Sequence, residues 1–124
     1  MRVLKTRPFS RKARSDGLGD IALLAAAAAI EAGLVDARLG GCLVKQRVAR
    51  PGSGKSGGFR LIVAYRARDR LVFLHVFAKS EKGNISGKEL RALQELGALY
   101  MGYSGDRITE LVRAGTLVEI GFDG

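Results

Sequence analysis

The sequence predicts one α+β domain over residues 1–124, in which a small antiparallel β-sheet is packed by an N-terminal helical hairpin and a C-terminal helix. Two observations predict this class. A chain of 124 residues with 47% hydrophobic residues can bury one core, and no internal repeat divides it. Helical patterns come first along the chain, strand patterns follow, and helical patterns return near the end, an order typical of α+β domains.

The N-terminal part is expected to form a short strand and two helices. Residues 1–5 have the pattern of an edge strand. Ser10 is expected to cap a short helix that runs through residue 13 or 14. Asp20 is expected to cap the alanine-rich helix that follows, and Gly33 to end it. The two helices would form the hairpin.

Three consecutive antiparallel strands are expected in the middle of the chain, at residues 42–49, 59–66 and 70–79. In the first strand, alternation puts Val44, Gln46 and Val48 on one side. Lys45 and Arg47 share the other side. The other two strands are apolar on both sides, which predicts a sheet partly covered on both faces, with the helices packed on one side.

The C-terminal part carries the clearest helix signal. Ser86 and Glu89 have the spacing of a capping box at the start of a helix. The apolar residues that recur at helical spacing behind it are Leu90, Leu93, Leu96, Tyr100 and Met101. A short helix at 106–114 and a last strand at 117–120 complete the prediction.

Basic residues dominate the charge of the chain, with a formal net charge of +9 and a pI near 10.3. Between Cys42 and Arg68 there is no carboxylate, and the basic side chains are Lys45, Arg47, Arg50, Lys55, Arg60, Arg66 and Arg68. Such residues often serve solubility alone. Because these alternate along neighbouring strands, we expect them to converge on one exposed patch, where like charges need an anion. A nucleic acid is the predicted partner, and an anionic membrane is its rival.

The sequence argues against a membrane-spanning or secreted protein and against a bound metal or cofactor. The apolar run at 21–30 is far shorter than the roughly 20 residues that span a bilayer, so it predicts a buried helix. Acidic residues before and after this run do not fit a signal peptide, and we expect a cytoplasmic protein without membrane contact. A single cysteine, Cys42, excludes an internal disulfide and a cysteine-built zinc site. We expect no metal and no other cofactor.

Two weaker motifs predict little chemistry. The glycines at 52, 54 and 57 match a dinucleotide-binding pattern, but a strand follows them where that motif requires a helix. A flexible hairpin loop explains them better. The lone His75 has no second histidine nearby, so a core or half-buried position is expected over a metal ligand, with general acid chemistry left open.

Three segments resemble one family of proteins. Residues 48–60 read VARPGSGKSGGFR, residues 78–85 read AKSEKGNI, and residues 89–93 read ELRAL. Together they resemble the RelE/HigB family of bacterial toxins, in particular a branch with a GKSGGxR loop and an AKxExxNI segment. The resemblance extends from about Pro8 to Ile120. It implies a RelE/ParE-like fold with the arrangement predicted above.

The resemblance implies the toxin of a type II toxin–antitoxin system, an endoribonuclease that cuts mRNA on the ribosome. Its reaction would be metal-free: the 2′-hydroxyl attacks the adjacent phosphodiester, and Lys and Arg stabilise the developing charge. The cognate antitoxin is expected to be a small DNA-binding protein, often of the helix-turn-helix type. It would hold the toxin inactive.

Matched position by position, the family's catalytic residues correspond to Lys45, Arg47, Arg60, Lys79, Glu81 and Lys82. Arg60 corresponds to the arginine that holds the scissile phosphate. Contacts with the RNA are expected from Arg50, Lys55 and Arg66. This chain lacks the C-terminal Tyr or His that several relatives use, so the last proton is left to Lys79, Lys82 or Glu81.

Two other classes of function remain open. One is an RNA- or DNA-binding module without catalysis. The other is a gyrase-poisoning toxin on the related ParE scaffold, against which the presence of Lys45, Arg47, Arg60 and Lys79 counts. Retention of RNA without fragments would favour the first, and DNA damage with intact messages would favour the second.

Overall fold

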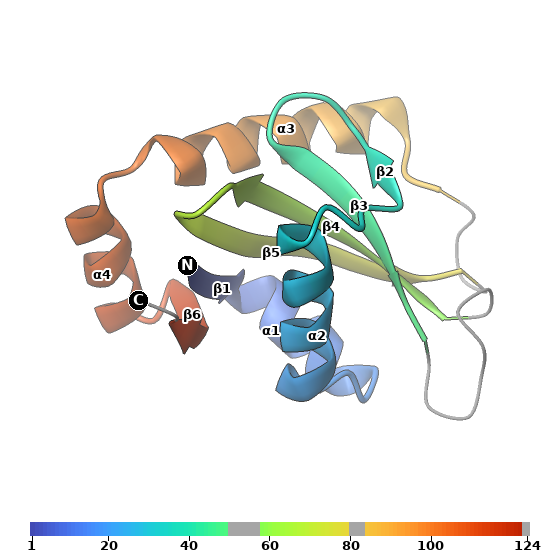
Figure 1. The fold of residues 1–124 in the computed structure, drawn as a ribbon, viewed down its shortest axis with the longest axis horizontal. Helices are drawn as coiled ribbons and strands as arrows, with labels where there is room; N and C mark the ends of the chain where they lie inside the picture. The colour runs from blue at the N-terminus through green and yellow to red at the C-terminus, as the bar shows by residue number, and fades with distance from the viewer. Residues whose placement is uncertain (50–57, 80–83, 123–124) are drawn as a thin grey trace.

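The computed structural model describes residues 1–49, 58–79 and 84–122 (Figure 1). A sheet runs through the middle of the molecule, with helices above and below it. The elements in chain order are β1 (Arg2–Thr6), α1 (Arg7–Ser15), α2 (Asp20–Glu31), β2 (Ala37–Arg38), β3 (Leu43–Val48), β4 (Phe59–Arg66), β5 (Arg70–Ala78), α3 (Gly87–Gly102), α4 (Gly105–Arg113) and β6 (Leu117–Phe122).

The six strands form one sheet in the order β2-β3-β4-β5-β1-β6. The predicted antiparallel run of β3, β4 and β5 is confirmed. β1 lies inside the sheet, parallel to β5 and antiparallel to β6. The prediction of an edge strand at residues 1–5 is therefore wrong. Leu4 has no exposed surface, because its strand has neighbours on both edges and helices over both faces.

The two N-terminal helices begin at other residues than predicted. Thr6 caps α1 by accepting a hydrogen bond on Oγ1 from the Phe9 N–H at 3.2 Å, and Ser10 is buried inside the helix. Gly19 is the cap residue of α2, whose first residue is Asp20. The Asp20 carboxylate is held elsewhere, by the Lys5 ammonium at 3.0 Å.

Helices cover both faces of the sheet. α1 and α2 pack on one face with Leu61 and Val63, whereas α3 and α4 pack on the other with Ile62 and Ala64. The prediction that the sheet is covered on both faces is confirmed, and the prediction that all helices lie on one side is wrong. The reason is the strands' own pattern, since both sides of β4 and β5 are apolar and each requires a covering layer.

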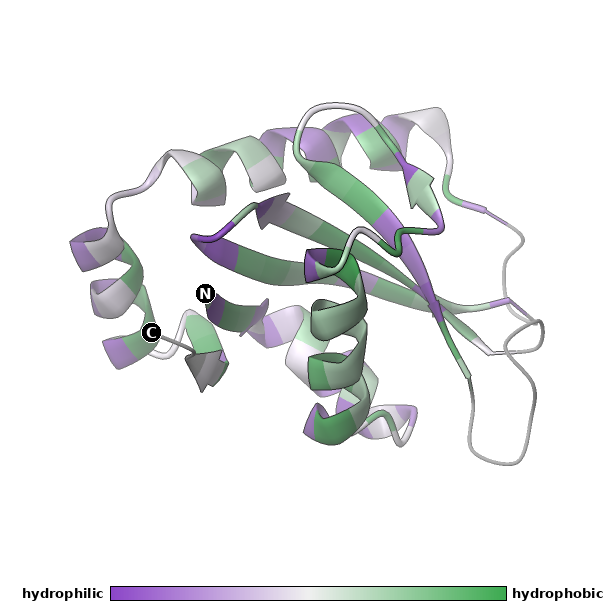
Figure 2. Ribbon diagram, in the orientation of Figure 1, coloured by the Kyte–Doolittle hydropathy of each residue, from purple (hydrophilic) through white to green (hydrophobic). Residues whose placement is uncertain are grey.

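The alanine-rich helix α2 is buried on one side only. Leu23, Ala27 and Ile30 face the sheet, whereas Ile21 is 88% exposed and Leu24 36%. Figure 2 shows hydrophobic colouring along most of the helix. Among the described residues, the structure contains no helix long and apolar enough to cross a membrane.

Helix α3 begins with the predicted capping box. Ser86 Oγ accepts from the Glu89 N–H at 3.1 Å, and the Glu89 carboxylate accepts from the Ser86 N–H at 3.0 Å. Midway along the helix, Gly97 lies against Cys42 and Ala64, where a Cβ atom would stand 2.9 Å from the Cys42 sulfur. This glycine lets α3 approach the sheet closely.

Candidate active site

Four of the six predicted catalytic residues lie at one end of the sheet, where β3 and β5 end and β4 begins. Arg47 stands directly opposite Arg60 in the β3–β4 register, and Arg60 stands opposite Phe77 of β5. The Lys79 N–H donates to the Gly58 carbonyl at 3.2 Å, which ties the end of β5 to the start of β4. We call this region, made of Lys45, Arg47, Arg60 and Lys79, the cationic end.

Strand alternation puts three of these residues on the same face of the sheet. Leu43 packs with the α3 layer and Val44 with the α2 layer, so Lys45 and Arg47 belong to the α3 side. Arg60 shares this side because its neighbour Ile62 packs there. The prediction that Val44 and Val48 share the opposite side from Lys45 and Arg47 is confirmed.

Arg60 is buried, with only 9% of its surface exposed. The prediction of an exposed cationic face is therefore wrong at this residue, which stands between Arg47 of β3 and Phe77 of β5 in the sheet. Its hydrogen bond to the Phe59 carbonyl is long, at 3.5 Å. Within the described residues no carboxylate pairs with it. A guanidinium has five N–H donors, so most of the donors of Arg60 remain available to an anion.

Arg47 is held by a carboxylate from outside its own strand. Asp36 accepts from the Arg47 backbone N–H at 2.6 Å and from its guanidinium at 3.2 Å. The prediction of an unneutralised basic segment is therefore wrong at Arg47, because Asp36 precedes the segment in sequence but lies beside it in the sheet. Lys45 is half-buried and makes no ion pair with another described residue.

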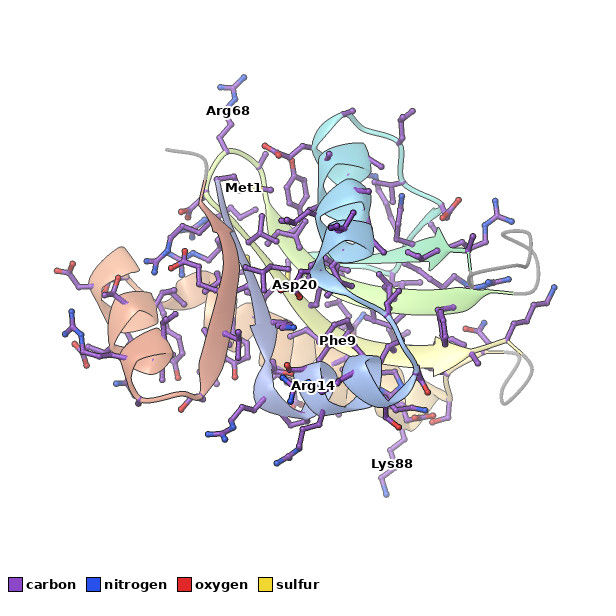
Figure 3. The ribbon with its side chains drawn as sticks, turned by 90° about the horizontal axis from the view of Figure 1, so that it is seen from below. Met1, Phe9, Arg14, Asp20, Arg68 and Lys88 are labelled. Atoms are coloured by element: carbon purple, nitrogen blue, oxygen red, sulfur yellow. The ribbon has the colours of Figure 1, made fainter. Side chains whose placement is uncertain are left out.

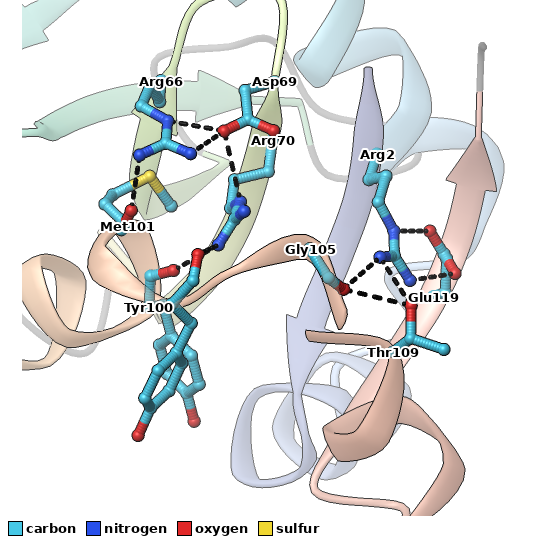
Figure 4. A network of polar contacts seen from close by, with 10 residues as sticks. Arg2, Arg66, Asp69, Arg70, Tyr100, Met101, Gly105, Thr109 and Glu119 are labelled. Atoms are coloured by element: carbon cyan, nitrogen blue, oxygen red, sulfur yellow. Dashed lines mark hydrogen bonds and ion pairs between the residues drawn. The ribbon is translucent and has the colours of Figure 1, made fainter. Parts of the chain in front are cut away.

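Arg66 does not join the cationic end. It lies six residues further along β4, about 20 Å away at the usual rise of a strand. Its guanidinium donates to Asp69 and to the Met101 carbonyl at 2.7 Å (Figure 4). Burial alone would raise the pKa of Asp69, but the Arg66 hydrogen bond and the Arg70 charge outweigh it and lower that pKa. Asp69, three residues after Arg66, is the sequence signal for this pairing.

The same network anchors the C-terminal end of α3. Arg70 is 3% exposed and donates to the Tyr100 carbonyl at 2.8 Å and the Tyr103 carbonyl at 2.7 Å. These are carbonyls that a helix end leaves without internal partners. Figure 4 shows both arginines reaching from the sheet to this helix end. We infer a structural role for Arg66 and Arg70, which fix one end of α3 to the sheet.

Four predicted site residues lie outside the described residues. They are Arg50, Lys55, Glu81 and Lys82. Their segments leave from Ala49 and Lys79 and return at Gly58 and Asn84. All four are therefore connected in sequence to the cationic end, where their predicted roles stay predictions.

His75 lies on β5 beside the cationic end. It stands opposite Ile62 in the register, so it shares the α3 side with Arg60. It is half-buried as predicted, and its ring centroid lies 5.8 Å from that of Phe77. The described residues contain no group of three or more His, Cys, Asp or Glu side chains that could hold a metal ion.

Sequence reasoning missed the apolar neighbours of Arg60. Phe77 is 5% exposed beside it, and Ile85, which precedes α3, packs against the same cluster. The pattern of β5 gives Phe77 as a core residue, but only the register shows that it stands next to a buried cation. These neighbours exclude water from one side of Arg60, which strengthens its attraction to an anion.

Comparison with known proteins gives one family. A family model described as the RelE toxin of the RelE/RelB toxin–antitoxin system matches residues 1–120. Searches among curated proteins and among solved structures give no significant match. The match includes both helical layers and the cationic end, so it concerns nearly the whole chain.

Proposed function

Because the chain belongs to the RelE toxin family, we propose that it cuts messenger RNA at the cationic end of its sheet. Toxins of this family are generally endoribonucleases, and each has a cognate antitoxin. The observation that carries the proposal is Arg60, a buried guanidinium without a carboxylate partner among the described residues. A buried charge is costly unless it is paired, and a substrate phosphate would supply the missing anion.

The proposed reaction is attack of the ribose 2′-hydroxyl on the neighbouring phosphodiester. The phosphorus passes through a crowded, negatively charged intermediate, and the bond to the 5′-oxygen then breaks. Arg60 is proposed to hold the phosphate oxygens through its planar pair of donors, with Arg47 beside it. Lys45 is proposed to help remove the 2′-hydroxyl proton, because it lies on the same face of the sheet as Arg47 and Arg60.

The proton for the leaving 5′-oxygen is assigned to the end of β5. Lys79 is exposed and follows that strand directly, so its ammonium is our first candidate. Glu81 and Lys82 come next in sequence and remain proposed members of the same group. Protonation of a leaving group by a positioned side chain accelerates such steps by roughly 10²–10⁴-fold.

Arg50 and Lys55 are proposed to contact the RNA on either side of the cut. Their segment connects β3 to β4 at the cationic end. Arg66 no longer belongs to this proposal, because its guanidinium is used by Asp69 and Met101. We further propose that cleavage takes place on the ribosome in the cytoplasm, and that the antitoxin is a helix-turn-helix DNA-binding protein.

The test is to induce the chain with and without its genomic neighbour and to map 5′ ends on a translated reporter message. We expect discrete new ends without the neighbour and their loss when it is present. Arg60→Lys should remove the ends, whereas Arg68→Gly should keep them, because Arg68 projects into solvent far from the cationic end (Figure 3). Intact messages with RNA retention in a gel assay would favour a binding module. Intact messages with DNA damage would favour gyrase poisoning.

A further inference from the structure

A second group of arginines lies on α1, far from the catalytic proposal. The helix reads RPFSRKARS and contains no acidic residue. Arg7, Arg11 and Arg14 recur at intervals of four and three residues, which places them along one side of the helix. Phe9 and Ala13 occupy the opposite, buried side. The helix therefore turns a row of three exposed cations to the solvent.

These three arginines line one groove of about 320 Å³, together with Ser10, Gly115 and Val118. We call it the α1 groove. Among the described residues none of the three makes an ion pair. Lys12, the other basic residue of the helix, is paired with Asp16 at 3.1 Å and faces elsewhere. The unpaired cations are thus those that line the groove.

Figure 3 shows nitrogen-tipped side chains projecting from α1 away from the sheet. This helix packs on the face of the sheet opposite to α3, whereas Arg60 belongs to the α3 face. The α1 groove and the cationic end are therefore separate positive regions on different faces. Repulsion among three arginines along two helical turns favours an anion with several charges.

We propose that the α1 groove binds the sugar–phosphate backbone of double-helical RNA. The three arginines span about 10 Å along the helix axis, at 1.5 Å per residue. A row of this length can reach several phosphates of one strand, and an RNA duplex is recognised largely through its phosphates and 2′-hydroxyl groups. Arginine suits this contact because its planar donors fit two oxygens of one phosphate.

An acidic protein segment is the other polyanion to consider. Protein interfaces depend on apolar anchors that fill pockets at their centre. Among the described residues that line the α1 groove, Val118 is the one with an apolar side chain. The groove therefore offers three guanidinium groups but one apolar side chain among the described residues, which favours a phosphate backbone over a protein segment. The inference adds to the proposed nuclease a surface that would hold folded RNA while another segment is cut.

The experiment compares two triple variants of the full chain. Arg7, Arg11 and Arg14 are replaced by Gln in one, and the matched control carries Arg38→Gln, Arg68→Gly and Arg113→Gln at exposed positions elsewhere. Binding to a double-stranded RNA hairpin is followed by fluorescence anisotropy at several salt concentrations. Circular dichroism melting verifies that both variants fold.

We expect the α1 variant to bind the hairpin at least about tenfold more weakly than the control variant. The slope of log affinity against log salt should fall by about 2–3, because each lost phosphate contact contributes about 0.9. Equal affinities and slopes of the two variants would overturn the inference. Weakened antitoxin binding with unchanged RNA binding would also overturn it, in favour of the acidic segment. Failure of the nuclease proposal is a separate result, since it would appear as an uncut reporter with the unmodified chain.

Discussion

Arg47 and Arg60 face each other across β3 and β4, yet only Arg47 has a carboxylate partner within the described residues. Two like charges directly opposite in a sheet destabilise it. Asp36 neutralises the exposed member of this pair, which leaves the buried member with donors to spare. An incoming phosphate would therefore meet Arg60 as a cation already in place and would compete with Asp36 for Arg47.

This competition predicts the effect of Asp36→Asn. Asparagine keeps an oxygen that can accept from the Arg47 N–H but removes the negative charge. We expect RNA affinity to rise by about two- to fivefold, the range of one exposed ion pair. Fluorescence anisotropy with an RNA oligonucleotide measures it. Asp106→Asn, on an exposed residue of α4, removes the same charge elsewhere, and an equal rise there would contradict a local role.

The close approach of α3 predicts opposite effects at two glycines of that helix. In Gly97→Ala the new Cβ would lie 2.9 Å from the Cys42 sulfur and 3.1 Å from a Leu43 methyl group. We expect a loss of about 1–3 kcal/mol in the free energy of unfolding. Gly102→Ala meets no atom within 4 Å and should be neutral or stabilising by up to about 1 kcal/mol. Urea unfolding of both variants measures these changes in the free energy of unfolding. Equal free energies for the two variants would mean that α3 does not approach the sheet as described.

The lowered pKa of the Asp69 carboxyl group leads us to expect a loss of folding stability in acid. Its pKa lies below the ordinary value in the folded protein, through the Arg66 hydrogen bond and the Arg70 charge acting against burial. A lowered carboxyl pKa contributes stability above about pH 4 and loses it as the pH falls through the folded-state pKa. Melting temperatures from about pH 6 to about pH 2.5 should therefore fall less in Asp69→Asn than in the unmodified chain. Glu95→Gln, on an exposed side chain of α3, should follow the unmodified chain, and parallel curves for all three would refute the linkage.

Much of the fold follows from local patterns that the sequence displays directly. The capping box at Ser86 and the alternation of Lys45 and Arg47 needed only neighbouring residues, and both are confirmed. The position of β1 could not be predicted in this way. Its parallel partner β5 begins at Arg70, and no local signal specifies a partner so distant in the chain.

In the candidate site, too, local patterns predict some features, whereas others depend on residues distant in the sequence. Local alternation placed Lys45, Arg47 and Arg60 on one face, but the count of basic residues could not show which of them had partners. Asp36 and Asp69 lie just outside the basic segment and neutralise Arg47 and Arg66. The burial of Arg60 is a tertiary property, because this residue stands between Arg47 of β3 and Phe77 of β5 in the sheet. The sequence alone therefore could not show that Arg60 is the buried arginine of the site whose N–H donors remain available.

Arg60 is proposed to stabilise the phosphate while the RNA is cut by its own 2′-hydroxyl. The most direct test measures 5′-hydroxyl ends on a reporter message translated in a cell-free extract, with the unmodified chain, Arg60→Lys or Arg68→Gly added. Lysine keeps the charge at this buried position but lacks the planar pair of donors. We expect Arg60→Lys, with its melting temperature retained, to produce ends about 10²–10³-fold more slowly, and Arg68→Gly to match the unmodified chain. Cleavage by Arg60→Lys at the unmodified rate would contradict the proposal.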